Sequence, residues 1–246
     1  MKKTLPALGL TISVAVTLIL THEGMAQWPT GLEVAETPHN LTRPAASTDP
    51  DMVGLIENYA EVCTYCHAPH GGNIDNALWN RRTPTGPFRM FNGGTDMIMD
   101  PQPTGNSLAC LSCHDGTMGL DDIVDLPNTY TGPGPAGTAI DECENCHKGG
   151  NPPGGLDWEG VWFDTDLRNQ HPISITYDTT LDPGFHPAAA VEAAGLKLFD
   201  GKVQCMTCHE PHTQRFRPFL RLDDTGGNLC LTCHISPPGE TTAHFW

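Results

Sequence analysis

The sequence predicts a mostly irregular fold with a few short α-helices and very little β-structure. Glycine (26) and proline (22) together make up roughly a fifth of the 246 residues, which works against long helices and strands. Only 38% of the residues are hydrophobic, against about 45–50% in a typical globular domain, so few side chains are available to build a core. A repeated cysteine motif is the third observation, and it points to a core that the polypeptide does not supply alone.

All ten cysteines lie in pentads of the form Cys-x-x-Cys-His. The pentads are Cys63–His67, Cys110–His114, Cys143–His147, Cys205–His209 and Cys230–His234. This is the attachment motif of haem c, in which two thiols add across the haem vinyl groups and the next histidine binds the iron. We therefore expect five covalent haems per chain. Each brings a large flat apolar surface, so the predicted fold class is a haem-cored multihaem cytochrome c.

Two other uses of cysteine pairs compete with haem attachment. Zinc sites also use Cys-x-x-Cys pairs, but ten thiols divide badly into groups of four, and zinc does not require a histidine after each pair. Disulfides suit an exported chain, but they leave the five histidines unexplained. The predicted attachment residues are Cys63, Cys66, Cys110, Cys113, Cys143, Cys146, Cys205, Cys208, Cys230 and Cys233. The predicted proximal iron ligands are His67, His114, His147, His209 and His234.

Residues 1–26 are expected to be a cleaved signal peptide. Lys2 and Lys3 precede an apolar run over residues 5–20, and a small-x-small site follows at residues 24–26. A retained membrane anchor is the alternative, but the run is short for a span and is interrupted by polar residues. No later stretch is apolar enough to cross a bilayer, so we expect an exported mature chain without a transmembrane segment.

The formal net charge is −16. Loss of residues 1–26 removes two lysines and one glutamate, which leaves −17, and haem propionates would make the charge more negative. Because nucleic acid repels such a surface, it is not an expected partner. Such a surface could bind a cationic patch on a partner redox protein, or it could simply be solvated, and both alternatives agree with this charge.

The mature chain, residues 27–246, is expected to form a single domain because haems shared along the chain make one core. Its two haem doublets are related, since Cys-x-x-Cys-His-x-Pro-His occurs at residues 63–70 and again at residues 205–212. The expected segments are an extended arm with a short helix over 27–60, a first haem doublet over 61–120, an insert with the third haem over 121–200, and a second doublet over 201–246.

Two helices are expected outside the pentads. Residues 52–60 carry an apolar stripe that includes Met52, Val53 and Ile56. Residues 187–198 are rich in alanine and begin with proline, which favours the first turn of a helix.

Each iron needs a second axial ligand opposite its proximal histidine. His70 and His212 each follow a pentad by three residues with a stiff proline between, so neither easily swings to the far face of its own haem. Each can instead reach the iron of a neighbouring haem. His39 and His171 are the next candidates, and His186 and His244 compete for the remaining site.

Methionine is the alternative axial ligand and would raise the reduction potentials. The available residues are Met90, Met97, Met99, Met118 and Met206. Because enough histidines are present, we expect all-histidine ligation and low potentials.

The pentads and their surroundings resemble the doubled-CXXCH family of multihaem cytochromes. The matching stretches are Cys63–Gly72, Leu78–Arg81, Cys110–Thr117, His171–Ser174 and Val203–His212. The resemblance implies that the distal ligands of tetrahaem members correspond to His39, His70, His171 and His212. The haem of Cys143–His147 is an addition to that pattern, and either His186 or His244 is left to serve it.

Electron transfer is the expected function, because six-coordinate irons have no open position for a substrate and closely spaced haems pass electrons along a chain. No catalytic residue is predicted. The family includes relatives of extracellular cytochrome filaments of metal-reducing bacteria and periplasmic electron carriers. The resemblance thus implies a respiratory role at the cell surface or outside the cell, with the periplasm as the alternative location. The implied partners are other redox proteins or extracellular electron acceptors.

Three more specific functions remain open. A head-to-tail filament would form if His39 or His244 bound a haem of the next subunit. A soluble shuttle would keep every ligand within one chain. A haem enzyme that reduces a small nitrogen oxyanion is disfavoured, because the Cys-x-x-Cys-Lys haem motif of pentahaem nitrite reductases is absent.

Overall fold

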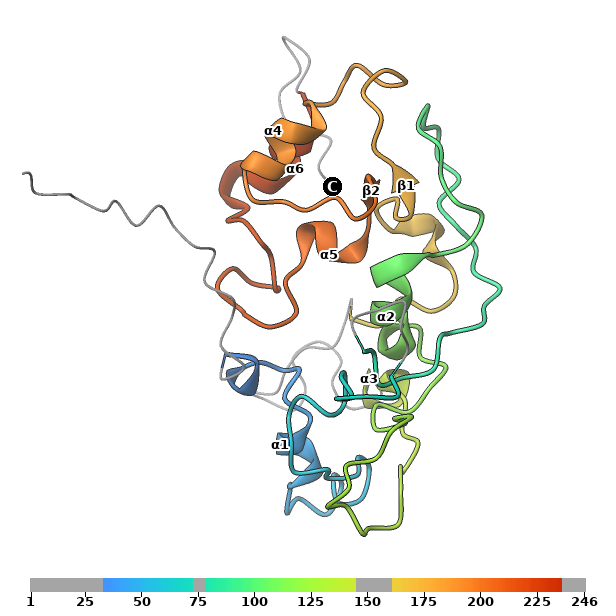
Figure 1. Cartoon of the computed structure of the whole chain (residues 1–246), viewed down its shortest axis with the longest axis vertical. Helices are drawn as coiled ribbons and strands as arrows, with labels where there is room; N and C mark the ends of the chain where they lie inside the picture. Colours follow the sequence, from blue (N-terminus) through green and yellow to red (C-terminus); the bar gives the residue numbers. More distant parts are fainter. Residues whose placement is uncertain (1–32, 73–77, 145–160, 236–246) are drawn as a thin grey trace, which may run out of the picture.

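The computed structural model describes residues 33–72, 78–144 and 161–235, in which loops and turns dominate (Figure 1). The α-helices of this part are α1 (Thr42–Ala45), α2 (Gly105–His114), α3 (Ile140–Glu144), α4 (Ala188–Ala193), α5 (Cys205–Cys208) and α6 (Asn228–Cys233). Short 3₁₀ turns are η1 (Val34–Glu36), η2 (Leu167–Asn169) and η3 (Thr225–Gly227). The prediction of a mostly irregular fold with a few short helices is confirmed.

The β-structure consists of one small sheet in the described part of the chain. Strands β1 (Ile175–Thr176) and β2 (Lys202–Val203) pair in antiparallel fashion, with Ile175 opposite Val203. Lys202 Nζ lies 2.5 Å from Asp100 Oδ2, which fastens this sheet to the long connection before α2. The ion pair thus joins the sheet, which lies in the second half of the sequence, to a segment of the first half.

The prediction of a helix over residues 52–60 is wrong. Residues 51–54 form turns, and Gly54 has a φ of +78°, which is incompatible with a continuing right-handed helix. The backbone then runs toward the buried Asp121, whose Oδ2 accepts a hydrogen bond from the Glu57 N–H at 2.5 Å. Ile56 of the apolar stripe therefore packs inward from a loop, whereas Val53 stays exposed.

The arm expected to be extended is also more folded than predicted. Its described part begins with η1 and α1, and the partly buried Leu41 and Ala45 pack against the hydrophobic cluster that contains Ile56. Tertiary packing thus stabilises turns in a proline-rich segment whose sequence shows no helical periodicity.

The helix expected over residues 187–198 is present but shorter. Pro187 caps α4, and the helix ends at Ala193 because Gly195 adopts a left-handed φ of +112°. This reversal turns Leu196, which is 1% exposed, into the core.

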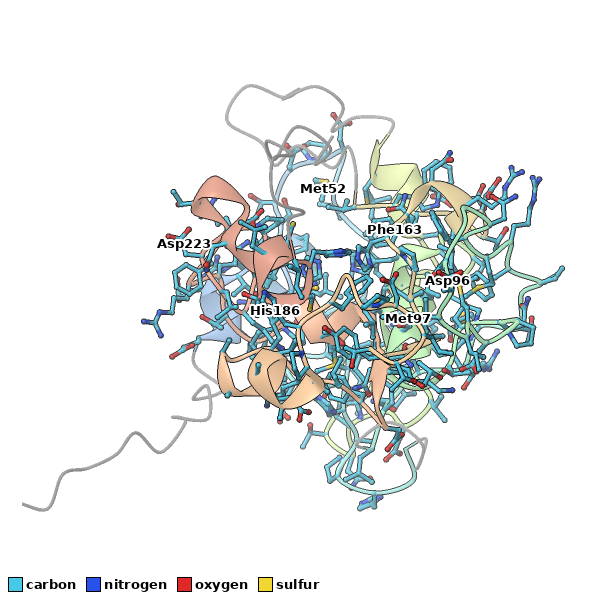
Figure 2. All side chains as sticks on the ribbon, turned by 90° about the horizontal axis from the view of Figure 1, so that it is seen from above. Met52, Asp96, Met97, Phe163, His186 and Asp223 are labelled. Atoms are coloured by element: carbon cyan, nitrogen blue, oxygen red, sulfur yellow. The ribbon has the colours of Figure 1, made fainter. Side chains whose placement is uncertain are left out.

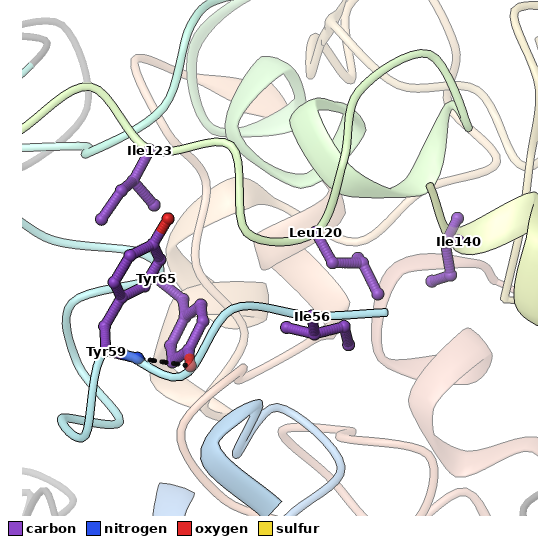
Figure 3. Packing of buried hydrophobic residues seen from close by; sticks show 6 residues of the cluster. All are labelled: Ile56, Tyr59, Tyr65, Leu120, Ile123 and Ile140. Atoms are coloured by element: carbon purple, nitrogen blue, oxygen red, sulfur yellow. Dashed lines mark hydrogen bonds between the residues drawn. The ribbon is translucent and has the colours of Figure 1, made fainter. Parts of the chain in front are cut away.

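The buried apolar side chains form three small clusters instead of one large core. The first cluster consists of Ile56, Tyr59, Tyr65, Leu120, Ile123 and Ile140 (Figure 3). The second consists of Met97, Ile175, Tyr177, Val191, Leu196 and Val203, and the third of Phe88, Leu111 and Leu167. Pentad cysteines pack against the first two clusters, so each of these two clusters ends where a haem is expected.

Arg81 is fully buried and joins two distant parts of the chain. Its Nη1 donates to Leu120 O at 2.8 Å, and its Nη2 donates to Gly119 O at 2.6 Å and to Ser112 O at 3.0 Å. The planar guanidinium suits several acceptors at once, which a lysine could not match. Arg81 therefore fixes the segment after the first pentad to the end of α2.

Within the described residues, no helix is long and apolar enough to cross a membrane. The expected signal peptide lies outside them.

We predict that Arg81→Met lowers the free energy of unfolding of the haem-loaded protein by more than about 2 kcal/mol, because three buried carbonyls lose their donor. The matched control is Arg43→Met, which removes an exposed ion pair to Glu36 and should change the free energy by less than about 1 kcal/mol. Denaturant titrations of both variants provide the measurement. Equal losses in the two variants would contradict the role assigned to Arg81.

Candidate haem-binding sites

The pentads lie on short helical turns. Cys110 and His114 lie at the end of α2, α5 begins at Cys205 and ends at Cys208, and α6 carries the fifth pair of cysteines. Residues 62–66 form a turn. Because residues three apart lie on one face of a helical turn, the two thiols of a pentad come to the same side.

A return segment, residues 78–80, closes the first pentad. The Ala68 N–H donates to Leu78 O at 2.9 Å, and the Asn80 N–H donates to Cys66 O at 2.8 Å. Leu78, the first residue of this segment, has a left-handed φ of +58°. The pentad and its return segment therefore form a closed backbone loop.

Residues 219–221 form an equivalent return segment in the second doublet. The Glu210 N–H donates to Phe219 O at 2.7 Å, and the Arg221 N–H donates to Cys208 O at 2.8 Å. The first residue of this segment again has a φ of +58°. The repeat seen in the sequence is thus also a repeat of backbone conformation.

Three pentad histidines face histidines from distant parts of the chain. The pairs are His67 with His212, His114 with His39, and His234 with His171, with ring centroids 6.2, 6.2 and 6.4 Å apart. Two metal–imidazole bonds of about 2 Å and about 1 Å from each nitrogen to its ring centre give about 6 Å across one metal. The three pairs are therefore spaced like the two axial ligands of one iron.

The rings of the three pairs are oriented differently. Those of His67 and His212 are nearly parallel, with an angle of 16° between their planes. The planes of His39 and His114 cross at 72°, and those of His171 and His234 cross at 81°. One pair is thus distinguishable from the other two by geometry.

Backbone carbonyls hold the Nδ1 side of the rings in two of these pairs. His39 Nδ1 lies 3.0 Å from Pro211 O, His114 Nδ1 contacts Val161 O, and His171 Nδ1 lies 3.0 Å from the next residue's carbonyl. A ring that donates from Nδ1 keeps Nε2 for a metal. Burial lowers the pKa of His39 to about 4 and also lowers the pKa of His114, so these two rings are neutral at pH 7, as metal binding requires.

Aromatic side chains flank the pair of His39 and His114. Phe219 stacks on His39 with ring centroids 4.3 Å apart, and Phe163 stacks on His114 at 5.6 Å. Sequence reasoning missed both, because nothing in the spacing of Phe163 or Phe219 indicates a histidine neighbour.

His212 differs from these histidines because a carboxylate holds its Nδ1. Glu210 Oε1 lies 2.7 Å from His212 Nδ1, and Glu210 Oε2 lies 2.8 Å from Arg221 Nη1. Burial alone would raise the pKa of Glu210, but the hydrogen bond from His212 and the charge of Arg221 outweigh it and lower the pKa to about 2. The carboxylate is therefore charged at neutral pH.

Sequence reasoning also missed Glu210 and Arg221. The available signal was the comparison of the two repeats, since Ala68 and Asn80 occupy the equivalent positions in the first one. Such a difference between repeats marks a place where the two sites are not chemically identical.

Three other predicted ligands are placed differently. The His70 side chain is 77% exposed, and its Nδ1 lies 3.6 Å from Asp125 Oδ2. The His209 ring has no ring contact with another histidine of the described segments. The His186 N–H donates to Cys233 O at 2.8 Å, which places this residue beside the fifth pentad (Figure 2). The ligand roles of His70 and His186 remain predictions.

The third pentad is only partly described. Cys143 lies in α3 and packs against the first hydrophobic cluster, whereas Cys146 and His147 lie outside the described residues, as does His244. Among the methionines considered as ligands, Met97 is buried in the second cluster, Met99 packs against that cluster, and Met90 packs against the third.

The part of the chain that the structure describes contains no side-chain arrangement that matches a zinc site or a disulfide. There, no three His, Cys, Asp or Glu side chains converge as a metal site would, and the cysteines of the four fully described pentads form no disulfides. What is present is a thiol pair with facing imidazoles. This donor set fits a haem c with two histidine ligands.

The pentads adjoin one another through their cysteines. Helix α2 packs against α5, which brings the second and fourth pentads together. The neighbouring cysteines are Cys110 and Cys205 between these helices, Cys66, Cys113 and Cys143 around the first hydrophobic cluster, and Cys208 and Cys233 in the second doublet. The described cysteines of the pentads therefore belong to one continuous series.

Residues 198–237 match the family model of the doubled CXXCH motif. The matched part contains the fourth and fifth pentads with the second return segment. The match supports a c-type cytochrome-like family and covalent binding of haem c. A comparison with curated proteins finds no match.

We predict that His212→Ala converts one haem from low-spin to high-spin, and that this haem is the one attached to Cys63 and Cys66. The reason is that the ring facing His67 is lost, whereas the fourth pentad keeps its own histidine. Thr213→Ala, a change at the adjacent residue, is the control and should leave every iron low-spin. Ferric electron paramagnetic resonance (EPR) provides the measurement, and an all-low-spin spectrum of His212→Ala would refute the pairing.

Proposed function

We propose that this chain transfers electrons through five covalently attached haems with histidine on both sides of each iron. The observation that carries the proposal is the facing of His67 with His212, His114 with His39, and His234 with His171 at 6.2–6.4 Å. A bound haem c supplies an iron that takes up or releases one electron. The family match to the doubled CXXCH motif supports the same reading.

The protein residues would hold the haems as follows. The first haem takes Cys63, Cys66, His67 and His212; the second takes Cys110, Cys113, His114 and His39; the fifth takes Cys230, Cys233, His234 and His171. The fourth takes Cys205, Cys208 and His209, with His70 as the proposed distal ligand. The third takes Cys143, Cys146 and His147, with His186 or His244.

Two histidine ligands per iron favour electron transfer over catalysis. A substrate needs an open iron position, and the facing rings would fill both axial positions of three haems. The proximity of the pentads supports transfer from haem to haem along the chain. The proposed role is therefore that of an electron carrier and not of a reductase.

We further propose that the chain is exported and works at the cell surface or outside the cell, with redox proteins or extracellular acceptors as partners. The support is the apolar N-terminal run with its cleavage site and the acidic composition. For a filament, the pairing of His39 with His114 favours ligation within one chain, so a trans ligand would have to be His70 or His244.

The number of haems is tested by intact-protein mass spectrometry of the exported protein. We expect the mass of residues 27–246 plus five haems, because each pentad is complete. Reduction should produce a low-spin haem absorption spectrum that does not change with carbon monoxide. Four or fewer haems, or a large fraction that binds carbon monoxide, would contradict the proposal.

Assembly is tested by sedimentation of the same protein together with His70→Ala. A filament joined by His70 would sediment as polymer and would become monomeric in the variant, with one iron turning high-spin. A wild-type monomer in which every iron is low-spin would refute the filament and leave the soluble carrier.

A further inference from the structure

The partner of the Nδ1 atom differs among four of the histidines that face one another. His39, His114 and His171 contact backbone carbonyls through Nδ1, whereas His212 contacts the Glu210 carboxylate at 2.7 Å. A carbonyl is a neutral acceptor. A carboxylate is charged and draws the imidazole proton toward itself much more strongly.

The position of the Glu210 carboxylate is fixed from several sides. Its side chain is 17% exposed, and its second oxygen accepts from Arg221 Nη1 at 2.8 Å. Arg221 is itself 8% exposed and donates from Nε to Met206 O at 2.7 Å. The backbone N–H of Glu210 is held by Phe219 O. This site is therefore preorganised, not a chance surface contact.

Glu210 could affect the iron through its charge or through its hydrogen bond to His212. The opposite charges of Glu210 and Arg221 largely cancel at a distance, because they are only 2.8 Å apart. What does not cancel is the directional hydrogen bond from His212 Nδ1. The hydrogen bond gives the ring partial imidazolate character and makes Nε2 a stronger electron donor.

We propose that Glu210 is a positioning residue that acts through His212 to lower the reduction potential of the haem between His67 and His212. This inference rests on the proposed function. A more strongly donating ligand stabilises the ferric iron relative to the ferrous iron that one added electron would produce. Glu210 therefore gives this haem a ligand that differs chemically from His39, His114 and His171, which contact backbone carbonyls.

The first repeat shows that the carboxylate is not needed to build the local backbone. Ala68 stands at the position of Glu210, and its N–H makes the same hydrogen bond to the return segment. A side chain without charge is thus compatible with this loop. Glu210 is an addition that changes the chemistry of the ligand and not the path of the chain.

The experiment is a potentiometric titration of the haem-loaded protein with redox mediators, followed by EPR. The haem in question can be identified because nearly parallel imidazole planes give a rhombic low-spin ferric spectrum, whereas strongly crossed planes give a single large-g signal. The 16° pair should produce the rhombic spectrum, and the 72° and 81° pairs should not. Glu210→Gln keeps the size of the side chain and an oxygen for Arg221 but removes the charge.

We expect Glu210→Gln to shift the midpoint of the rhombic haem to higher potential and to leave the other midpoints in place. The control is Glu192→Gln, which removes the same charge from an exposed position on α4 and should shift none. If Glu210→Gln does not load all its haems, Glu210→Asp replaces it, since a shorter carboxylate keeps the charge but loses the reach to Nδ1. The same upward shift is then expected.

An unchanged rhombic midpoint, or an equal shift of all midpoints, would overturn this inference while leaving electron transfer intact. A wild-type protein with no haem couples would overturn the proposed function itself. Because the first outcome is a difference between variants and the second is a property of the wild type, the two failures are distinguishable.

Discussion

Histidines from distant segments of the chain face the pentad histidines, and these contacts tie together a chain that has little other regular structure. His212 comes from the second doublet and lies against His67 of the first. His39 comes from the N-terminal segment, lies against His114, and is held by the Pro211 carbonyl beside His212. If an iron joins each pair, each haem becomes a link between distant segments. Such links reduce the conformational freedom of the unfolded chain, as other covalent cross-links do.

The polypeptide supports these links with short, local devices. Three small apolar clusters replace a single core, and cysteines lie at the edges of the first two. The return segments close the pentads by backbone hydrogen bonds, and Arg81 collects three carbonyls near the end of α2. These polar contacts hold the backbone in place, as the hydrogen bonds of regular helices and sheets do in other folds. They are needed because buried backbone groups must find hydrogen-bond partners wherever they lie.

A similar backbone in the two repeats does not make their sites equivalent. Both return segments begin with a left-handed residue and close their pentad with the same pair of hydrogen bonds. The side chains differ, however, since Glu210 and Arg221 occupy the positions of Ala68 and Asn80. One repeat thus presents a histidine backed by a charged carboxylate, and the other presents the exposed His70 near Asp125. In a chain of haems, such differences are a means to separate potentials without changing the ligand type.

The sequence by itself determined the attachment chemistry, the irregular fold and the duplication. The pentads are local, so their meaning does not depend on the path of the chain, and a high content of glycine and proline excludes long regular elements wherever they lie. It also supplied the distal candidates, but it could not pair them, because ligand pairs join residues far apart in the sequence. The prediction of a helix over residues 52–60 was wrong partly for the same reason, since the distant Asp121 accepts a hydrogen bond from the Glu57 N–H. The left-handed Gly54 also interrupts this segment locally. Only the tertiary structure decided that His212 faces His67 and that Glu210 stands behind it, because those contacts depend on how separate loops pack.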